Sequence, residues 1–159
     1  MTMQAYKKFL ELTSKDLPQE LLQDIIEVKR NTFYDPNKNA LWAQEKNIDF
    51  VFTGRFLGEK KKDFIPSPYG VEHASAAAQH NQKIVLNEKG AWLFICGRDA
   101  FGQAILKGKP KKNRIVYLYD VHDNLLGMGH WLVNDLTIKQ SEQAVIKNLY
   151  DKGRYIRQE

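Results

Sequence analysis

The sequence has little of what disulfides and membrane spans require. It contains one cysteine, Cys96, so no internal disulfide can form. Its apolar runs are short, and the run from Ala91 to Cys96 is far below the roughly 18 to 20 residues of a transmembrane helix. Lys7, Lys8 and Glu11 interrupt the segment where a secretory signal would lie. These absences predict a cytoplasmic protein with no membrane association.

The sequence also lacks the spacings of common catalytic and metal sites. It has four histidines but no His-Glu-x-x-His or Cys-x-x-Cys motif. The glycines Gly54 and Gly58 are not followed by the Gly-Lys-Ser/Thr ending of a phosphate-binding loop. Cys96 follows Phe94 and Ile95, which favours a small buried hydrophobe over a nucleophile. We therefore expect no metal, no cofactor and no enzymatic activity.

Charge is unevenly distributed along a chain of globular composition. Of the 159 residues 43% are hydrophobic and 27% charged, and the formal net charge is +5. Residues 1–50 contain 7 Lys/Arg and 8 Asp/Glu (net −1), whereas residues 51–159 contain 17 and 11 (net +6). A basic second part is typical of proteins that bind RNA or DNA, and it also fits a solubilising surface.

The candidate RNA-binding residues fall into two basic clusters and one separate arginine. A loop carries five cations within eight residues, and a second cluster lies near the C-terminus, where Tyr150 and Tyr155 could contact unstacked bases. A charged loop between strands is also often only solvated. We expect the C-terminal cluster to bind more tightly, because a strand would hold its charges in place before RNA arrives. The candidates are Arg98; Lys107, Lys109, Lys111, Lys112 and Arg114; and Lys147, Lys152, Arg154 and Arg157.

The sequence of the first half of the chain predicts helices followed by the start of a sheet. Apolar spacing predicts helices over residues 5–12 and from Pro18 to Lys29, the second capped by Asp16. Turn-forming residues predict a loop over 31–39, and aromatic and β-branched residues predict a strand over 49–58. Ser67 and Pro68 predict the start of a helix that runs to about His80, which would place His73 and His80 on one face.

The second half reads as short strands with one helix. The pattern predicts strands over 83–86 and 104–106, and a helix from Glu88 to Cys96 between the capping residues Asn87 and Gly97. Residues 114–120 and 125–133 predict a β-hairpin, and residues 145–149 a further strand. We expect the following residues in the core: Trp92, Phe94, Ile95, Val116, Leu118 and Leu126.

Several of these segments resemble a known family. The run Gly90 to Leu106, the pattern Leu126-Gly127-Met128-Gly129 and residues 151–157, which match the closing strand, resemble a PUA domain, a small pseudobarrel of RNA-modifying and ribosome-assembly proteins. Upstream, Gly54 to Gly58 and Phe64 are similar to the end of a pre-PUA domain. This pairing characterises the archaeal and eukaryotic large-subunit biogenesis factor of the nuclear-import-protein-seven type. The Ser-Pro segment around Pro66 also resembles the RNA-binding tail of bacterial rRNA cytosine methyltransferases.

The resemblance implies an α+β protein with an N-terminal α/β pre-PUA domain (1–80) and a small mixed-β PUA pseudobarrel (82–159). It implies a non-catalytic factor that contacts single-stranded or loop regions of rRNA during large-subunit biogenesis. The N-terminal half would contact ribosome-assembly or RNA-processing proteins. Two alternatives remain open: a protein-interaction adaptor of an RNA-processing complex, and an RNA-binding component that works in trans with an rRNA or tRNA methyltransferase.

Overall fold

The computed structural model describes two compact units, Met1–Ala77 and Ala78–Glu159. The residues it describes are 4–13, 19–23, 25–28, 32–36, 42–43, 45–48, 54–134 and 142–157. Asp16, Pro18 and residues 49–53, which the sequence assigns to a helix start and a strand, lie outside them. No helix among the described residues is long and apolar enough to span a membrane.

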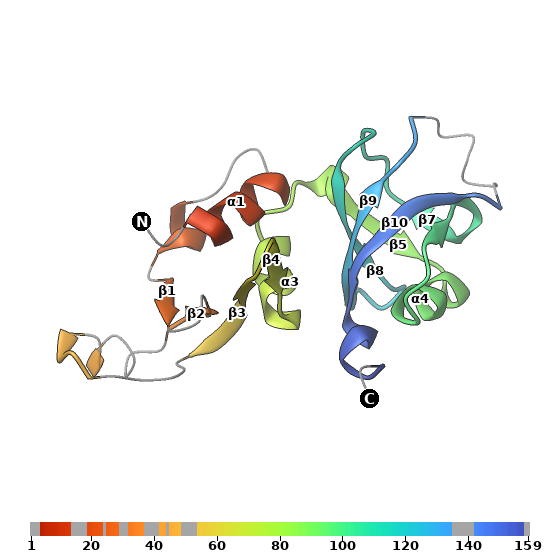
Figure 1. The fold of residues 1–159 in the computed structure, drawn as a ribbon. Helices are drawn as coiled ribbons and strands as arrows, with labels where there is room; N and C mark the ends of the chain where they lie inside the picture. The colour runs from red at the N-terminus through yellow and green to blue at the C-terminus, as the bar shows by residue number, and fades with distance from the viewer. Residues whose placement is uncertain are drawn as a thin grey trace. The chain divides into compact units, whose positions relative to one another are not determined.

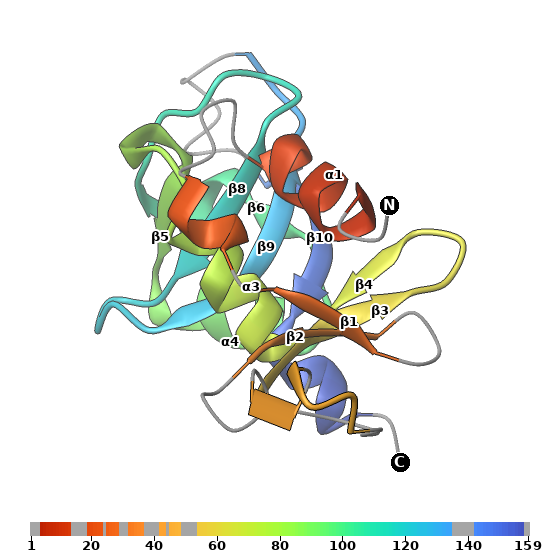
Figure 2. The same cartoon turned by 90° about the vertical axis from the view of Figure 1, so that its left-hand side faces the viewer.

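The first unit is a four-stranded sheet in the order β1-β2-β3-β4 with helices packed against it. Neighbouring strands are antiparallel, and Figure 2 shows β3 and β4 as a hairpin. Its elements are α1 (Gln4–Thr13), η1 (Gln19–Leu22), β1 (Ile26–Val28), β2 (Thr32–Asp35), β3 (Arg55–Lys60), β4 (Phe64–Pro66) and α3 (Pro68–Ser75).

Aromatic rings form much of the core of this unit. The ring of Phe64 lies 5.2 Å from that of Tyr6, 5.0 Å from that of Phe9 and 5.6 Å from that of Phe33, measured between centroids. Offset and edge-on contacts of this kind stabilise a core beyond simple area burial. They hold α1 against β4 and β2.

Two predictions for this unit are wrong. The predicted second helix is instead the short helix η1 followed by β1, because the β-branched Ile26 and Val28 are buried in a strand paired with β2. The predicted loop over 31–39 contains β2, where Thr32 to Tyr34 pair with β1 and Thr32 to Asp35 pair with β3. The strand preference of Thr32, Phe33 and Tyr34 was stronger than the preference of Asp35-Pro36 for a turn.

The helix predicted after Ser67 is confirmed at its start and wrong at its end. Ser67 Oγ accepts a hydrogen bond from Gly70 N at 2.9 Å, and α3 begins at Pro68. The helix ends at Ser75 rather than near His80. The backbone is extended at Gln79, and a separate short helix, η2 (His80–Gln82), follows. His73 and His80 therefore do not share a helix face.

The second unit is a strongly curved six-stranded sheet in the order β6-β10-β9-β8-β5-β7 (Figure 1). The parallel pair β5–β8 and the antiparallel pairs β8–β9 and β9–β10 form its centre. Helix α4 packs against this sheet and contacts β5, β6, β9 and β10. The elements are β5 (Lys83–Leu86), α4 (Glu88–Ile95), β6 (Ala100–Phe101), η3 (Gly102–Ala104), β7 (Ile105–Lys107), β8 (Ile115–Tyr119), β9 (Leu125–Trp131), β10 (Ala144–Asp151) and η5 (Lys152–Tyr155).

Most of the secondary structure predicted for this unit is confirmed. Strand β5, the β8–β9 hairpin and β10 lie where the sequence places them. Helix α4 is capped by Asn87, whose Oδ1 accepts a hydrogen bond from Gly90 N at 2.8 Å. After the helix, Gly97 adopts a left-handed backbone (φ 86°), as its cap position requires. The prediction that residues 151–157 form a closing strand is wrong for residues 152–155, which form the short helix η5.

The core of the second unit differs from prediction at two positions. Phe94, Val116, Leu118 and Leu126 are buried, as expected, and Ile95 is partly buried and packs against this core. Trp92 is 64% exposed, because the buried side of α4 is formed by Gly90, Ala91 and Phe94. Cys96 is also exposed rather than buried, because it follows the last residue of α4.

We predict that a buried Tyr–His contact stabilises the first unit. Tyr6 Oη and His73 Nδ1 lie 2.7 Å apart and join α1 to α3. Replacing Tyr6 with Phe should lower the free energy of unfolding by about 0.5–1.5 kcal/mol, since one hydrogen bond to a partly buried group is lost. Chemical denaturation followed by circular dichroism would measure the change.

The same contact predicts a pH dependence. Burial lowers the pKa of His73, so the folded protein holds this ring neutral while the unfolded chain still binds a proton near pH 6.5. Stability should be full above that pH and fall as the pH drops through it. A His73→Gln variant should have a flatter stability profile between pH 7 and 5; equal slopes for the variant and the parent would contradict the assignment.

Candidate nucleic-acid interface

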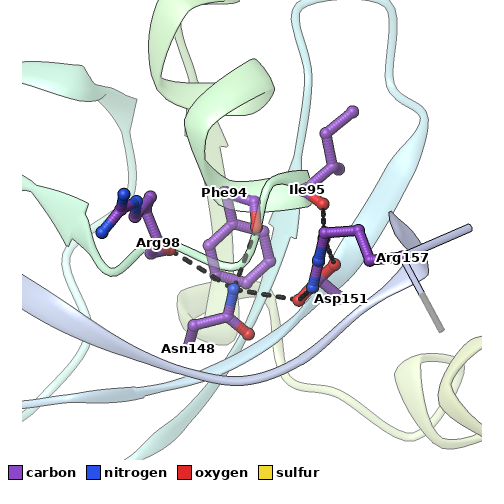
Figure 3. Close-up of polar contacts among 6 residues, drawn as sticks. All are labelled: Phe94, Ile95, Arg98, Asn148, Asp151 and Arg157. Carbon is purple, nitrogen blue, oxygen red and sulfur yellow. Dashed lines mark hydrogen bonds and ion pairs between the residues drawn. The ribbon is translucent and has the colours of Figure 1, made fainter. Parts of the chain in front are cut away.

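The most connected polar network of the second unit joins the end of α4 to the C-terminal segment (Figure 3). Arg157 donates to Asp151 through both ends of its guanidinium group, Nη1 to Oδ1 at 2.9 Å and Nη2 to Oδ2 at 3.0 Å. Arg157 Nη1 also donates to the carbonyl of Ile95 at the end of α4. Asp151 is buried, so this two-pronged pair compensates a carboxylate that would otherwise be costly to bury.

Asn148 on β10 completes this network. Its Nδ2 lies within hydrogen-bond distance of Phe94 O (2.9 Å), Arg98 O (3.3 Å) and Asp151 Oδ2 (3.2 Å). The last carbonyl groups of a helix have no partner within the helix, so these side chains satisfy acceptors at the end of α4. We call Asn148, Asp151 and Arg157 the C-terminal clasp.

Close backbone packing accompanies the clasp. A Cβ atom added at Gly153 would lie 1.9 Å from the carbonyl oxygen of Ile95. Only glycine therefore fits where η5 crosses the end of α4. The clasp and this approach fix the loop that carries Arg98 and Asp99, whose Oδ1 accepts a hydrogen bond from Asn148 N at 2.8 Å.

Beside the clasp, α4 and β6 enclose a surface groove. It consists of two adjoining hollows that share Leu93, Asp99 and Phe101. Phe101 is 36% exposed. We call this the α4–β6 groove; its polar and aromatic lining is Asn87, Lys89, Arg98, Asp99, Phe101 and Gln103.

A second groove lies along the other edge of the sheet, between β5 and β7. Lys83 is tied there by an ion pair to Asp123, and its Nζ lies 4.5 Å from the centroid of the Tyr119 ring. The hydrogen bond to Asp123 raises the pKa of Lys83, so this cation stays charged. We call this the β5–β7 groove; its main lining residues are His80, Asn81, Lys83, Leu106, Lys107 and Lys109.

The predicted RNA-binding residues separate into three groups. Lys107, Lys109, Lys111 and Lys112 are exposed and Arg114 is half-buried, on and after β7. Arg98 lies at the α4–β6 groove. Lys147 on β10 and Arg154 in η5 are exposed, and Lys152, also in η5, is half-buried.

One predicted contact is wrong, and a second has a competing partner within the protein. The guanidinium group of Arg157 donates to Asp151 and Ile95 in the clasp, and RNA binding by this residue stays a prediction. Tyr150 is only 3% exposed, so its ring cannot stack on a base. Phe101 and Lys89, which line the α4–β6 groove, were not among the predicted RNA-binding residues. An aromatic residue on a two-residue edge strand, such as Phe101, gives no sequence signal of exposure.

The described residues hold no cluster of three or more His, Cys, Asp or Glu side chains that could bind a metal ion. Of the histidines, His80 and His122 are exposed, and His73 and His130 are half-buried.

We predict that the clasp stabilises the second unit. Arg157→Ala leaves the buried carboxylate of Asp151 without its partner, and Arg157 is itself partly exposed, so the loss should be about 2 kcal/mol of unfolding free energy. Arg154→Ala, three residues earlier in the chain and exposed, is the matched control and should change stability by less than about 0.5 kcal/mol. Equal stability of the two variants in denaturant titrations would show that the clasp contributes nothing.

Comparison with known proteins agrees with the fold of this unit. Residues 82–159 match the family described as the UPF0113 PUA domain. A UPF0113 protein of Archaeoglobus fulgidus is 30% identical over 78 residues, which is 47% of this chain and 45% of that protein. The chain thus covers less than half the length of this relative.

Two solved structures are similar in fold. A conserved PUA domain protein of Thermoplasma acidophilum matches with a TM-score of 0.51 and 13% identity, over 72% of this chain and 88% of its own. A hypothetical protein of Pyrococcus horikoshii OT3 matches with a TM-score of 0.55 and 12% identity, over 95% of this chain and 92% of its own. The predicted fold class, α+β with a small mixed-β pseudobarrel, is confirmed. Residues 82–159 match the PUA domain family in sequence, and the chain matches PUA-domain proteins in fold.

Proposed function

We propose that the protein is a non-catalytic RNA-binding factor whose α4–β6 groove takes single-stranded RNA. One observation carries the proposal: an exposed aromatic ring, Phe101, lies in a groove flanked by the cations Lys89 and Arg98. The match of residues 82–159 to a PUA domain supports it, since PUA domains are in general RNA-binding modules.

Each part of the groove suits one part of a nucleotide. The face of Phe101 offers a stacking platform for an unpaired base, which is worth about 1–3 kcal/mol per base. The Lys89 and Arg98 side chains, on either side, attract the backbone phosphates. Gln103 and Asp99 supply a donor and acceptors within reach of base edges.

Single-stranded RNA fits this groove better than a duplex. Stacking on Phe101 requires a base that has left its neighbours, and bases in loops and single strands are free to do so. In an A-form helix the base faces are covered, and the major groove is too deep and narrow for side chains to read. We therefore expect single-stranded or loop RNA to be the ligand.

We further propose that the RNA is rRNA of the assembling large ribosomal subunit. The support is the resemblance of Gly54–Gly58 and of residues 82–159 to the two parts of a large-subunit biogenesis factor. The first unit, residues 1–80 in the sequence-based division, then serves to contact assembly proteins. Crosslinking in cells followed by sequencing of the bound RNA tests this. If the bound RNA is the target of a methyltransferase instead of the rRNA of pre-ribosomal particles, the proposal is contradicted.

The groove itself is tested by separating stacking from charge. Phe101→Ala should weaken binding of a single-stranded oligouridine by about 5- to 100-fold, since one stacked base is lost, without changing the salt dependence. A Lys89→Ala/Arg98→Ala variant should reduce the slope of log K against log salt by up to about 1.4, which is about 0.7 per phosphate contact on a single strand. Fluorescence anisotropy at several salt concentrations measures both.

The matched control lies on the first unit. Lys7→Ala/Lys8→Ala removes the same charge from the exposed side of α1 and should leave the affinity within about twofold. If this variant weakens binding as much as Lys89→Ala/Arg98→Ala, the RNA responds to net charge rather than to the groove. If Phe101→Ala binds like the parent, the RNA site lies elsewhere.

A further inference from the structure

Strand β7 is an open edge of the six-stranded sheet. It pairs with β5 on one side, and no strand of the described chain pairs with its other side. An edge strand presents unpaired N–H and C=O groups, which makes it a template for an added strand. Ile105 is buried in the core, so the strand is anchored while Leu106 and Lys107 face outward.

The β5–β7 groove beside this edge is mainly apolar. It is a concavity of about 640 Å³ whose lining includes Leu106 and Val85. Leu106 is 50% exposed although it lies in a strand of the sheet. Covering such a side chain is favourable by roughly 25 cal/mol per Å² of apolar surface removed from water.

The rim of the groove is positively charged. Lys107 and Lys109 are exposed and form no ion pair with any residue in the described part of the chain. Lys111 and Lys112 follow within a few residues and are also exposed. The acidic residue in the lining, Asp123, is neutralised by Lys83. The charge of the groove is therefore complementary to a negative ligand.

We propose that the β5–β7 groove binds an extended acidic segment of a partner protein, which adds a strand to β7. Main-chain hydrogen bonds to the strand edge would hold the segment. Because side chains alternate along a strand, aliphatic side chains of the segment would meet Leu106 while its carboxylates meet Lys107 and Lys109.

Features of the groove favour a peptide over RNA as the occupant. Its lining contains no Phe, Tyr or Trp ring: the exposed ring there is the smaller imidazole of His80, and Lys83 covers the nearby ring of Tyr119. An apolar floor gains nothing from phosphates, whereas it gains from aliphatic side chains. The groove thus differs from the α4–β6 groove, whose centre is Phe101.

The probe is a fluorescein-labelled octapeptide of alternating valine and glutamate, titrated with the full chain by fluorescence anisotropy. We expect saturable binding that weakens with salt. Leu106→Asp should weaken it by about tenfold or more, because the variant loses apolar contact and repels the carboxylates. The matched control is Leu149→Asp, an aliphatic residue 40% exposed on β10, which should bind within about twofold of the parent.

A second probe tests the added strand directly. The same peptide with alternate backbone amides N-methylated keeps its charge and side chains but loses its hydrogen-bond donors, and it should fail to bind. Equal affinity of the methylated and parent peptides would overturn the proposal, since charge alone would then hold the ligand. The proposal is also overturned if Leu106→Asp weakens oligouridine binding as strongly as peptide binding, because the groove would then be a nucleic-acid site.

Discussion

The pair between Arg157 and the buried carboxylate of Asp151 is the interaction on which the second unit depends. It joins the last described residues of the chain to the end of α4, where the carbonyl group of Ile95 accepts a hydrogen bond from Arg157. A buried carboxylate is tolerated only with such compensation. Asn148, which donates to Asp151, also donates to the carbonyl of Arg98. The clasp therefore helps to fix the loop after α4 and the position of Arg98 at the α4–β6 groove.

Local signals in the sequence were sufficient for much of the fold. The side-chain oxygens of Ser67 and Asn87 mark helix starts because each caps a backbone N–H three residues later, and the alternating pattern of β8 and β9 marks a hairpin. The signals predicted α1 and the start of α3 in the first unit but failed over residues 26–35, where pairing with neighbouring strands decided the structure. The predicted helix containing Ile26 became a strand because its partner, β2, was not recognised.

The candidate site was less predictable, because exposure and pairing are properties of the folded chain. Trp92 and Cys96 have apolar sequence neighbours, yet both are exposed: Trp92 lies on the outer side of α4, and Cys96 follows the last residue of that helix. The charge of Arg157 suggests a phosphate ligand, but a carboxylate six residues away, brought close by η5, takes up its donors. Composition identified a basic half, and only the structure divides it into two grooves with different linings.

The sequence separation of the clasp residues bears on how fast the second unit folds. Arg157 and Ile95 are 62 residues apart, and Asn148 and Phe94 are 54 apart. Closing loops of this length costs conformational entropy before any contact repays it, so chains dominated by such contacts fold in milliseconds to seconds rather than microseconds. The β8–β9 hairpin, joined by a short turn, forms from local contacts, whereas the hydrogen bonds from Asn148 and Arg157 to the end of α4 form only after β10 has joined the sheet.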